Sequence, residues 1–155
     1  MLLFENQAYS LGLNIVGYQY PTHETGYWDA NWLFVEVEVR HPNGSWTVVS
    51  PCLLTFEVEN LAQWFEQVTQ GTNRWQESAF TEPCLKFETI QRDGNPSILR
   101  IYFEIDARPT WAYSRAAGLE DLWVEFTFDE INLLEAANHL RELLKKYPQR
   151  VFRDS

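Results

Sequence analysis

Apolar and polar residues alternate along much of the chain, and this period of two predicts β-strands, because successive strand side chains point to opposite faces. The clearest strand is 32–40, where every second residue is aliphatic: Leu33, Val35, Val37 and Val39. The Pro-Asn-Gly sequence at 42–44 favours a turn, and 46–49 is the expected returning strand of an antiparallel hairpin. Shorter alternating runs predict further strands at 11–15, 85–90, 98–106 and 122–128.

Two segments instead carry apolar residues at the three- and four-residue spacing of amphipathic helices. In the first segment these residues are Val58, Leu61, Trp64, Phe65 and Val68. In the second segment they are Leu133, Leu134, Ala137, Leu140, Leu144 and Tyr147. Thr55 and Asp129 are the expected N-caps, because their side-chain oxygens can accept from the first free amides, and Gly71 and Pro148 mark the expected ends.

Together these elements predict an α+β fold, with a mostly antiparallel β-sheet of about six strands and two α-helices packed on one face. A length of 155 residues is typical of one domain. We therefore expect 1–155 to form a single domain, with a frayed tail at 149–155.

Three of the predicted strands have two unlike faces. One face is aliphatic or Phe, whereas the other combines Trp or Tyr with carboxylates. We expect the helices to cover the first face and to leave the second open, as a surface that binds another protein. The candidate partner-binding residues, including those of two aromatic loops, are Trp28, Asp29, Trp32, Glu36, Glu38, Tyr102, Glu104, Asp106, Trp111, Trp123 and Glu125. The other interpretation is that the rings pack under loops as a second, minor core.

The formal net charge of −10 bears on the choice of partner. Nucleic acid and anionic membranes both require a basic patch on the protein, so neither is an expected partner. A positively charged protein is the natural one, although an acidic charge also keeps a protein soluble. The first seven residues show no basic leader with a long apolar run, and no uncharged stretch approaches the ~20 residues of a membrane span. We therefore expect a cytoplasmic protein, either a monomer or a weak homodimer.

The sequence predicts no metal site, no cofactor and no catalytic centre. His23, His41 and His139 are far apart in the chain. Cys52 and Cys84 lack the spacing of a metal or redox site, so we expect two reduced, partly buried thiols. Phosphate-binding glycine loops and nucleophile elbows are absent from the sequence.

Two other functions remain open at this point. Glu36 or Glu38 together with Glu104 has the chemistry of a carboxylate-dependent hydrolase, provided that the acids flank a cleft. Acids balanced by Arg40 and Arg100 on a solvated strand face account for the same residues. A pocket for a sugar or another planar molecule is the second alternative. Its expected lining is Trp32, Trp111 and Trp123.

Five short segments also follow one another in a distinctive order: 17–21 (GYQYP), 27–33 (YWDANWL), 51–55 (PCLLT), 80–83 (FTEP) and 100–104 (RIYFE). With Arg108, Pro109 and the final acidic strand and helix, they resemble the WapI-type immunity proteins of bacteria over nearly the whole chain. The resemblance implies a cytoplasmic antidote, which binds the toxic C-terminal domain of a polymorphic or contact-dependent toxin. In the best-known setting of that family the toxin attacks tRNA. Nuclease toxins are usually basic, which suits an acidic inhibitor.

Overall fold

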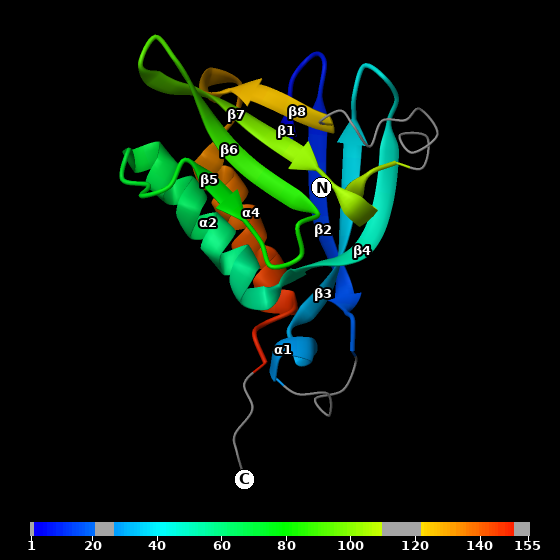
Figure 1. The fold of residues 1–155 in the computed structure, drawn as a ribbon. Helices are drawn as coiled ribbons and strands as arrows, with labels where there is room; N and C mark the ends of the chain where they lie inside the picture. The colour runs from blue at the N-terminus through cyan, green and yellow to red at the C-terminus, as the bar shows by residue number, and fades with distance from the viewer. Residues whose placement is uncertain (1, 21–26, 110–121, 151–155) are drawn as a thin grey trace.

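The computed structural model describes residues 2–20, 27–109 and 122–150. Within these residues, eight strands form two antiparallel sheets of four strands each, and helices pack against them (Figure 1). The predicted α+β class and the antiparallel strand pairing are confirmed. The strand number differs from the expected six, and the strands are divided between two sheets.

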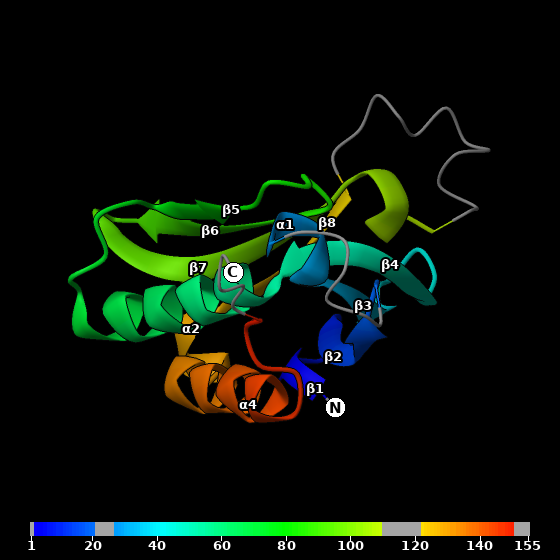
Figure 2. The ribbon, with the colours of Figure 1, turned by 90° about the horizontal axis from the view of Figure 1, so that it is seen from below.

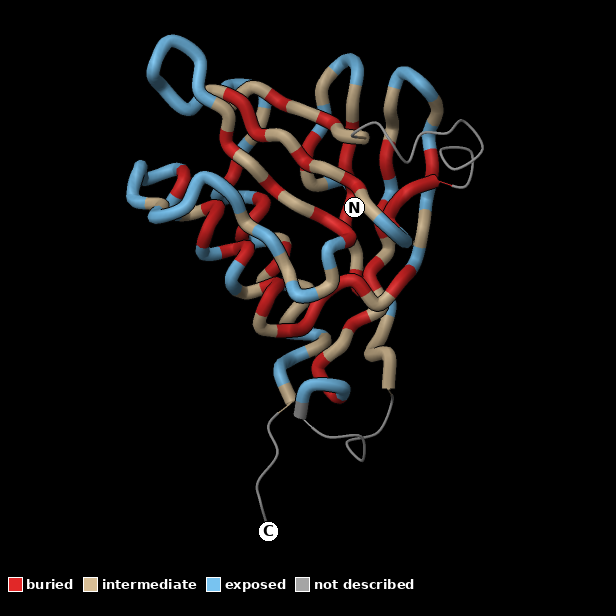
Figure 3. The backbone as a smooth tube through the Cα atoms, in the orientation of Figure 1, coloured by how far each residue is buried: buried red, intermediate tan, exposed pale blue. Residues whose placement is uncertain are grey.

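The first sheet contains β1 (Leu2–Glu5), β2 (Ser10–Tyr18), β3 (Trp32–Arg40) and β4 (Trp46–Leu54), side by side in chain order. All four aliphatic residues of β3 are buried, as its alternation predicts. The predicted hairpin of β3 and β4 is confirmed. Buried and more exposed positions alternate visibly along these strands in Figure 3.

The second sheet contains β5 (Glu77–Ala79), β6 (Leu85–Arg92), β7 (Asn95–Phe103) and β8 (Leu122–Thr127). The turn between β6 and β7 is shorter than the gap of 91–97 left between the two predicted strands, because Asp93 and Gly94 adopt positive φ angles of 53° and 82°. Two such residues close a tight hairpin, so the residues after them already belong to β7. The short strands β1 and β5 were not predicted, since neither is long enough to show an alternating pattern.

Strand β7 also ends earlier than the alternation suggests. The expected strand runs to Asp106, but β7 stops at Phe103 and a 3-10 turn, η2 (Ile105–Ala107), follows. Ile105 has a φ of 48° and is 43 % exposed instead of lying on the core face. The prediction for 104–106 is therefore wrong, and these residues do not extend a sheet face.

Three α-helices occur in the described part of the chain: α1 (Tyr27–Ala30), α2 (Thr55–Gln70) and α4 (Leu133–Lys146). Both predicted long helices are present, but both predicted caps are wrong. Thr55 is the first helical residue, and the amide of Leu54 before it donates to Glu57 Oε1 at 3.0 Å. Asn132 caps α4 by accepting from the Glu135 amide at 3.0 Å. Asp129 cannot do so, because it lies in a separate 3-10 turn, η4 (Phe128–Glu130).

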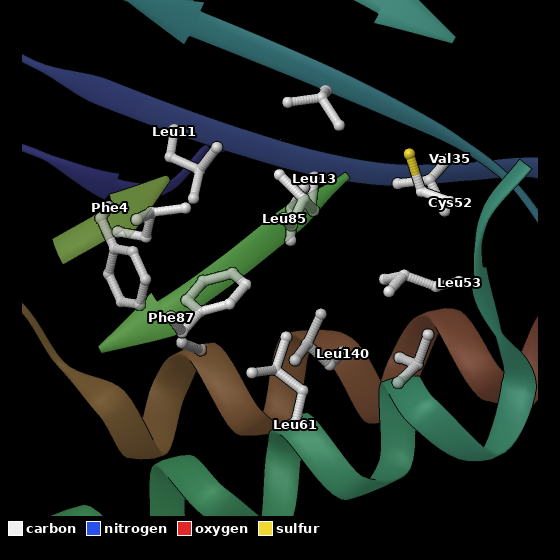
Figure 4. Packing of buried hydrophobic residues seen from close by; sticks show 14 of the residues in the cluster. Phe4, Leu11, Leu13, Val35, Cys52, Leu53, Leu61, Leu85, Phe87 and Leu140 are labelled. Atoms are coloured by element: carbon white, nitrogen blue, oxygen red, sulfur yellow. The ribbon is translucent and has the colours of Figure 1, made fainter. Parts of the chain in front are cut away.

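The two sheets and the two long helices enclose one hydrophobic core. Figure 2 shows α2 between the second sheet and α4, with the first sheet running alongside. In Figure 4, Leu13 of the first sheet, Phe87 of the second, Leu61 of α2 and Leu140 of α4 converge. The helices thus cover the aliphatic sheet faces, as predicted. One residue of the α4 stripe, Leu134, is exposed instead.

The end of the described chain is anchored at the pole that carries α1 (Figure 1). The buried side chain of Asn31 accepts from the Arg150 amide at 2.8 Å and donates to the Arg150 carbonyl at 3.0 Å. The Tyr18 hydroxyl donates to the carbonyl of Pro148 at 2.6 Å. Arg150, which was expected in a frayed tail, is therefore held in place, and 151–155 lie outside the described residues.

Candidate functional site

The predicted partner-binding residues do not form one surface. Trp32, Glu36 and Glu38 lie on β3 of the first sheet, whereas Tyr102, Trp123 and Glu125 lie on β7 and β8 of the second. The remaining residues lie at strand ends, in α1 or, for Trp111, outside the described residues. The structure therefore offers several candidate surfaces, which differ in how their charges are paired.

On the outer face of the second sheet, charges and rings are already paired with one another. Arg100 donates to the Glu125 carboxylate at 3.0 Å, and its guanidinium lies 4.2 Å from the centroid of the Trp123 ring. Lys86 places its ammonium 4.4 Å from the centroid of the Tyr102 ring. Burial raises the pKa of the Tyr102 hydroxyl, so this group stays neutral. Because Arg100 and Lys86 already lie among the acids of this face, it attracts a cationic partner only weakly.

The two acids at the end of β7 have different surroundings. Glu104 forms an ion pair with Arg108 at 3.3 Å, and Arg108 is buried and also donates to the Phe103 carbonyl at 3.0 Å. Glu104 therefore compensates a buried charge. Asp106 is exposed on η2. Neither lies opposite the acids of β3, because β3 and β7 belong to different sheets.

Trp28 and Asp29 lie in α1, at the pole of the molecule next to the start of α2 (Figure 1). Trp28 is 58 % exposed and packs edge-on against Phe56 at a centroid distance of 5.3 Å. Asp29 is exposed beside it. This pole is separate from both outer sheet faces.

The outer face of the first sheet has acids without compensation. The strand register places Asn14, Glu36 and Val49 in one row across β2, β3 and β4, with Glu38 and Thr47 in the next row. Cross-strand neighbours of this kind are about 5 Å apart. Within the described ranges, neither glutamate has an ion-pair partner.

The cation nearest to these acids in the strand register, Arg40, is turned toward backbone oxygens. Its guanidinium donates to the carbonyls of Gln7 at 2.8 Å and Asn6 at 2.7 Å, in the turn between β1 and β2. These bonds brace the turn and leave Glu36 and Glu38 uncompensated. The expected balance of β3 acids by Arg40 is thus wrong.

Apolar side chains are exposed on the same face of the first sheet, and sequence reasoning missed them. Leu2 is 51 % exposed, Val16 45 % and Val49 51 %. A hollow of about 620 Å³ opens beside Leu2. Its lining on this face includes Leu2, Glu5, Ser10, Glu38, Arg40 and Thr47. The alternation at 46–49 places Thr47 and Val49 on the strand face opposite Trp46, and this pattern could have identified both as outward-facing residues.

The described residues needed for the two alternative functions, a pocket for a planar ligand and a hydrolase, do not lie together in the structure. Trp32 and Trp123 lie on different sheets, and neither lines a pocket formed by the described residues. The third residue of the predicted pocket, Trp111, lies outside the described residues. Glu38 lines the hollow of the first sheet, whereas Glu104 lines a separate hollow of about 230 Å³. The acids of the proposed hydrolase therefore do not flank one cleft.

The two cysteines lie together inside the core. Both are buried, and Ser50 Oγ is 2.8 Å from Cys52 Sγ. A hydrogen bond to Cys52, together with burial, raises the pKa of the Cys84 thiol. Across the described ranges, no group of three or more His, Cys, Asp or Glu residues is arranged to hold a metal ion.

The chain was compared with models of known protein families, with curated proteins and with solved structures. The model of the immunity protein WapI-like family matches residues 1–148. No curated protein and no solved structure matches the chain. None of the helices in the described ranges is both long and apolar enough to cross a lipid bilayer.

Proposed function

The chain belongs to the WapI-like family of immunity proteins, and from this premise we propose that it binds one cognate bacterial toxin domain and neutralises it. The family match over 1–148 is the observation that carries this function, because it covers both sheets and both long helices. Neutralisation here means stoichiometric binding, in which the chain acts as an inhibitor and not as an enzyme. The cytoplasm is the proposed place of action, where an antidote meets a toxin before the toxin reaches its target.

The proposed partner is a basic nuclease domain, of the kind that cleaves tRNA. A nuclease needs cationic side chains to hold RNA phosphates. An inhibitor with a net charge of −10 is attracted to the same side chains, and it displaces RNA when it covers them. Glu36 and Glu38 on the first sheet support this proposal, because neither forms an ion pair with a cationic side chain in the described part of the chain.

The test mixes the purified chain with each toxin domain encoded beside its gene and follows tRNA cleavage. We expect one equivalent of the chain to abolish cleavage by its cognate domain, and a stable complex to form on a sizing column. An unrelated folded protein of the same net charge is the control, because any polyanion competes weakly with RNA. Full cleavage in the presence of the chain, with every neighbouring toxin domain, would refute the proposed function.

If the cognate toxin domain is not a nuclease, neutralisation has to be measured by an assay other than tRNA cleavage. Growth of cells that express the toxin domain, with and without the chain, measures neutralisation independently of the chemistry of the toxin. Rescue of growth without inhibition of tRNA cleavage would retain the immunity function and reject the nuclease partner.

A further inference from the structure

We propose that the toxin docks on the outer face of the first sheet, and that a Lys or Arg side chain of the toxin enters the hollow beside Glu38. This assignment rests on the proposed function and narrows it to one of the molecule's faces. The face is defined by seven residues from β1 to β4 and is called the β1–β4 face below. They are Leu2, Glu5, Val16, Glu36, Glu38, Thr47 and Val49.

The charge of the β1–β4 face selects a cationic occupant. It carries three carboxylates, those of Glu5, Glu36 and Glu38, and none of them has an ion-pair partner in the described part of the chain. Arg40 is the cation among the residues that line the hollow, and its donors are engaged by backbone carbonyls. A cation that arrives from a partner therefore meets carboxylates that are still available.

The apolar side chains on the β1–β4 face favour a protein over a small cation. Leu2, Val16 and Val49 are each about half exposed and lie among the acids. Apolar contact area of this kind is gained only when an extended surface covers it. Both long helices pack on the opposite side of the sheet, so the face is not covered by either of them (Figure 2).

The hollow gives the face a shape that one long side chain can fill. Its lining on this face combines the short side chains of Ser10 and Thr47 with the carboxylates of Glu5 and Glu38. A volume of about 620 Å³ admits a Lys or Arg side chain together with water. The cationic group of such a side chain then lies within reach of the two carboxylates.

The outer face of the second sheet provides the contrast. Its Glu125 is paired with Arg100 at 3.0 Å, and its Glu77 approaches Lys86 at 4.0 Å. A partner cation would compete there with cations that are already in place. Glu88 of β6 lies between Glu77 and Arg100 in the strand register and has no ion pair within the described ranges. The two faces thus have similar residue types, but Arg100 and Lys86 lie among the acids of the second sheet, whereas the acids of the β1–β4 face have no such cations beside them.

The test compares matched charge reversals on the two faces. The variant Glu36→Lys/Glu38→Lys changes the β1–β4 face, and Glu77→Lys/Glu88→Lys makes the same charge change on the second sheet. We expect the first variant to weaken toxin binding about tenfold or more, mainly through slower association and with a weaker salt dependence. The affinity of the second variant for the toxin is expected to stay within about twofold of the wild-type affinity, because its substitutions lie outside the proposed contact surface. Circular dichroism and melting temperature report whether each variant folds.

Two further variants test the docking face independently of the lysine substitutions. Glu36→Gln/Glu38→Gln removes the charge with little change of shape, and it replaces the lysine variant if the latter does not fold. Thr47→Trp fills the hollow without changing the charge, and it should also weaken binding about tenfold, because a strand tolerates the larger ring but the toxin side chain loses its place.

Each outcome decides between the two proposals. If the wild type binds its toxin and the β1–β4 variants bind equally well, the docking face is wrong and the proposed function stands. Equal weakening by both charge reversals would mean that net charge, and not this face, controls binding. A wild-type chain that binds none of the neighbouring toxin domains would refute the proposed function, and the docking face with it.

Discussion

Replacing Asn31 by alanine tests whether one buried amide holds the α1 pole together. The Asn31 side chain is fully buried and makes three hydrogen bonds to other residues of the described ranges. Its oxygen accepts from the Thr55 hydroxyl at 2.7 Å and from the Arg150 amide at 2.8 Å. Its nitrogen donates to the Arg150 carbonyl at 3.0 Å. The variant therefore loosens the start of α2 and the end of the chain at once.

The expected loss of stability follows from these three bonds. A net contribution of about 1 kcal/mol for each bond gives about 3 kcal/mol. The Thr55 hydroxyl is fully buried and loses its acceptor, which costs about 1–3 kcal/mol, whereas the half-buried Arg150 backbone can turn to water. We expect a loss of roughly 2–4 kcal/mol, which for a domain of this size lowers the melting temperature by roughly 5–15 °C.

Urea denaturation followed by tryptophan fluorescence measures this loss. Asn138→Ala is the matched control, because Asn138 is exposed on α4, and the change there should stay within about 0.5 kcal/mol. Thr55→Val removes the stranded hydroxyl, so the double variant Asn31→Ala/Thr55→Val should be more stable than the sum of the two single losses, by about 1 kcal/mol. A loss below about 1 kcal/mol for Asn31→Ala, or strict additivity in the double variant, would refute the reasoning.

Two other predictions concern titratable groups. Burial lowers the pKa of His41, whose Nδ1 accepts from the Asn43 amide at 3.0 Å. The neutral form of His41 stabilises the fold above the unfolded pKa of about 6.5, and this stabilisation is lost as the pH falls through the lower folded pKa. The free energy of unfolding of the wild type should therefore decrease as the pH is lowered through this range, and that of His41→Gln should not. Cys52 and Cys84 are fully buried, and the pKa of Cys84 is raised. A thiol reagent such as Ellman's should therefore label both only after urea unfolding, and rapid labelling of the native chain would contradict the buried pair.

Local patterns predict the elements well because burial follows them directly. The alternation at 32–40 and the helical spacing at 58–68 each give the element one apolar face, which is stabilised by burial away from water. Both elements form where they were expected. The same patterns say little about where elements stop. The alternation continues to Asp106, but β7 ends at Phe103, whose carbonyl accepts from the buried Arg108 side chain at 3.0 Å. That contact is invisible in a pattern of apolar residues.

The candidate site was only partly predictable, because periodicity assigns residues to faces and does not assign faces to sheets. Glu36 and Tyr102 were both placed correctly opposite buried neighbours, yet they lie on different sheets. Whether an acid is compensated depends on cross-strand register as well. Glu125 faces Arg100 directly, whereas Glu36 faces Asn14 and Val49. Register depends on turns and bulges, and the sequence alone does not fix it.

Four of the five segments that carry the family resemblance lie at the pole around Asn31 or beside it, and the fifth, 100–104, lies at the end of β7. The Thr55 hydroxyl donates to Asn31, and Asn31 also binds the end of the chain. The Thr81 amide donates to the Glu57 carboxylate at 2.7 Å. The seven residues of the β1–β4 face all lie outside those segments. Buried hydrogen-bonded contacts tolerate few replacements, because an unpaired group costs stability, whereas an exposed sheet face accepts many. We infer that such a fold can keep its framework while its exposed face changes, as the proposed recognition of one cognate toxin requires.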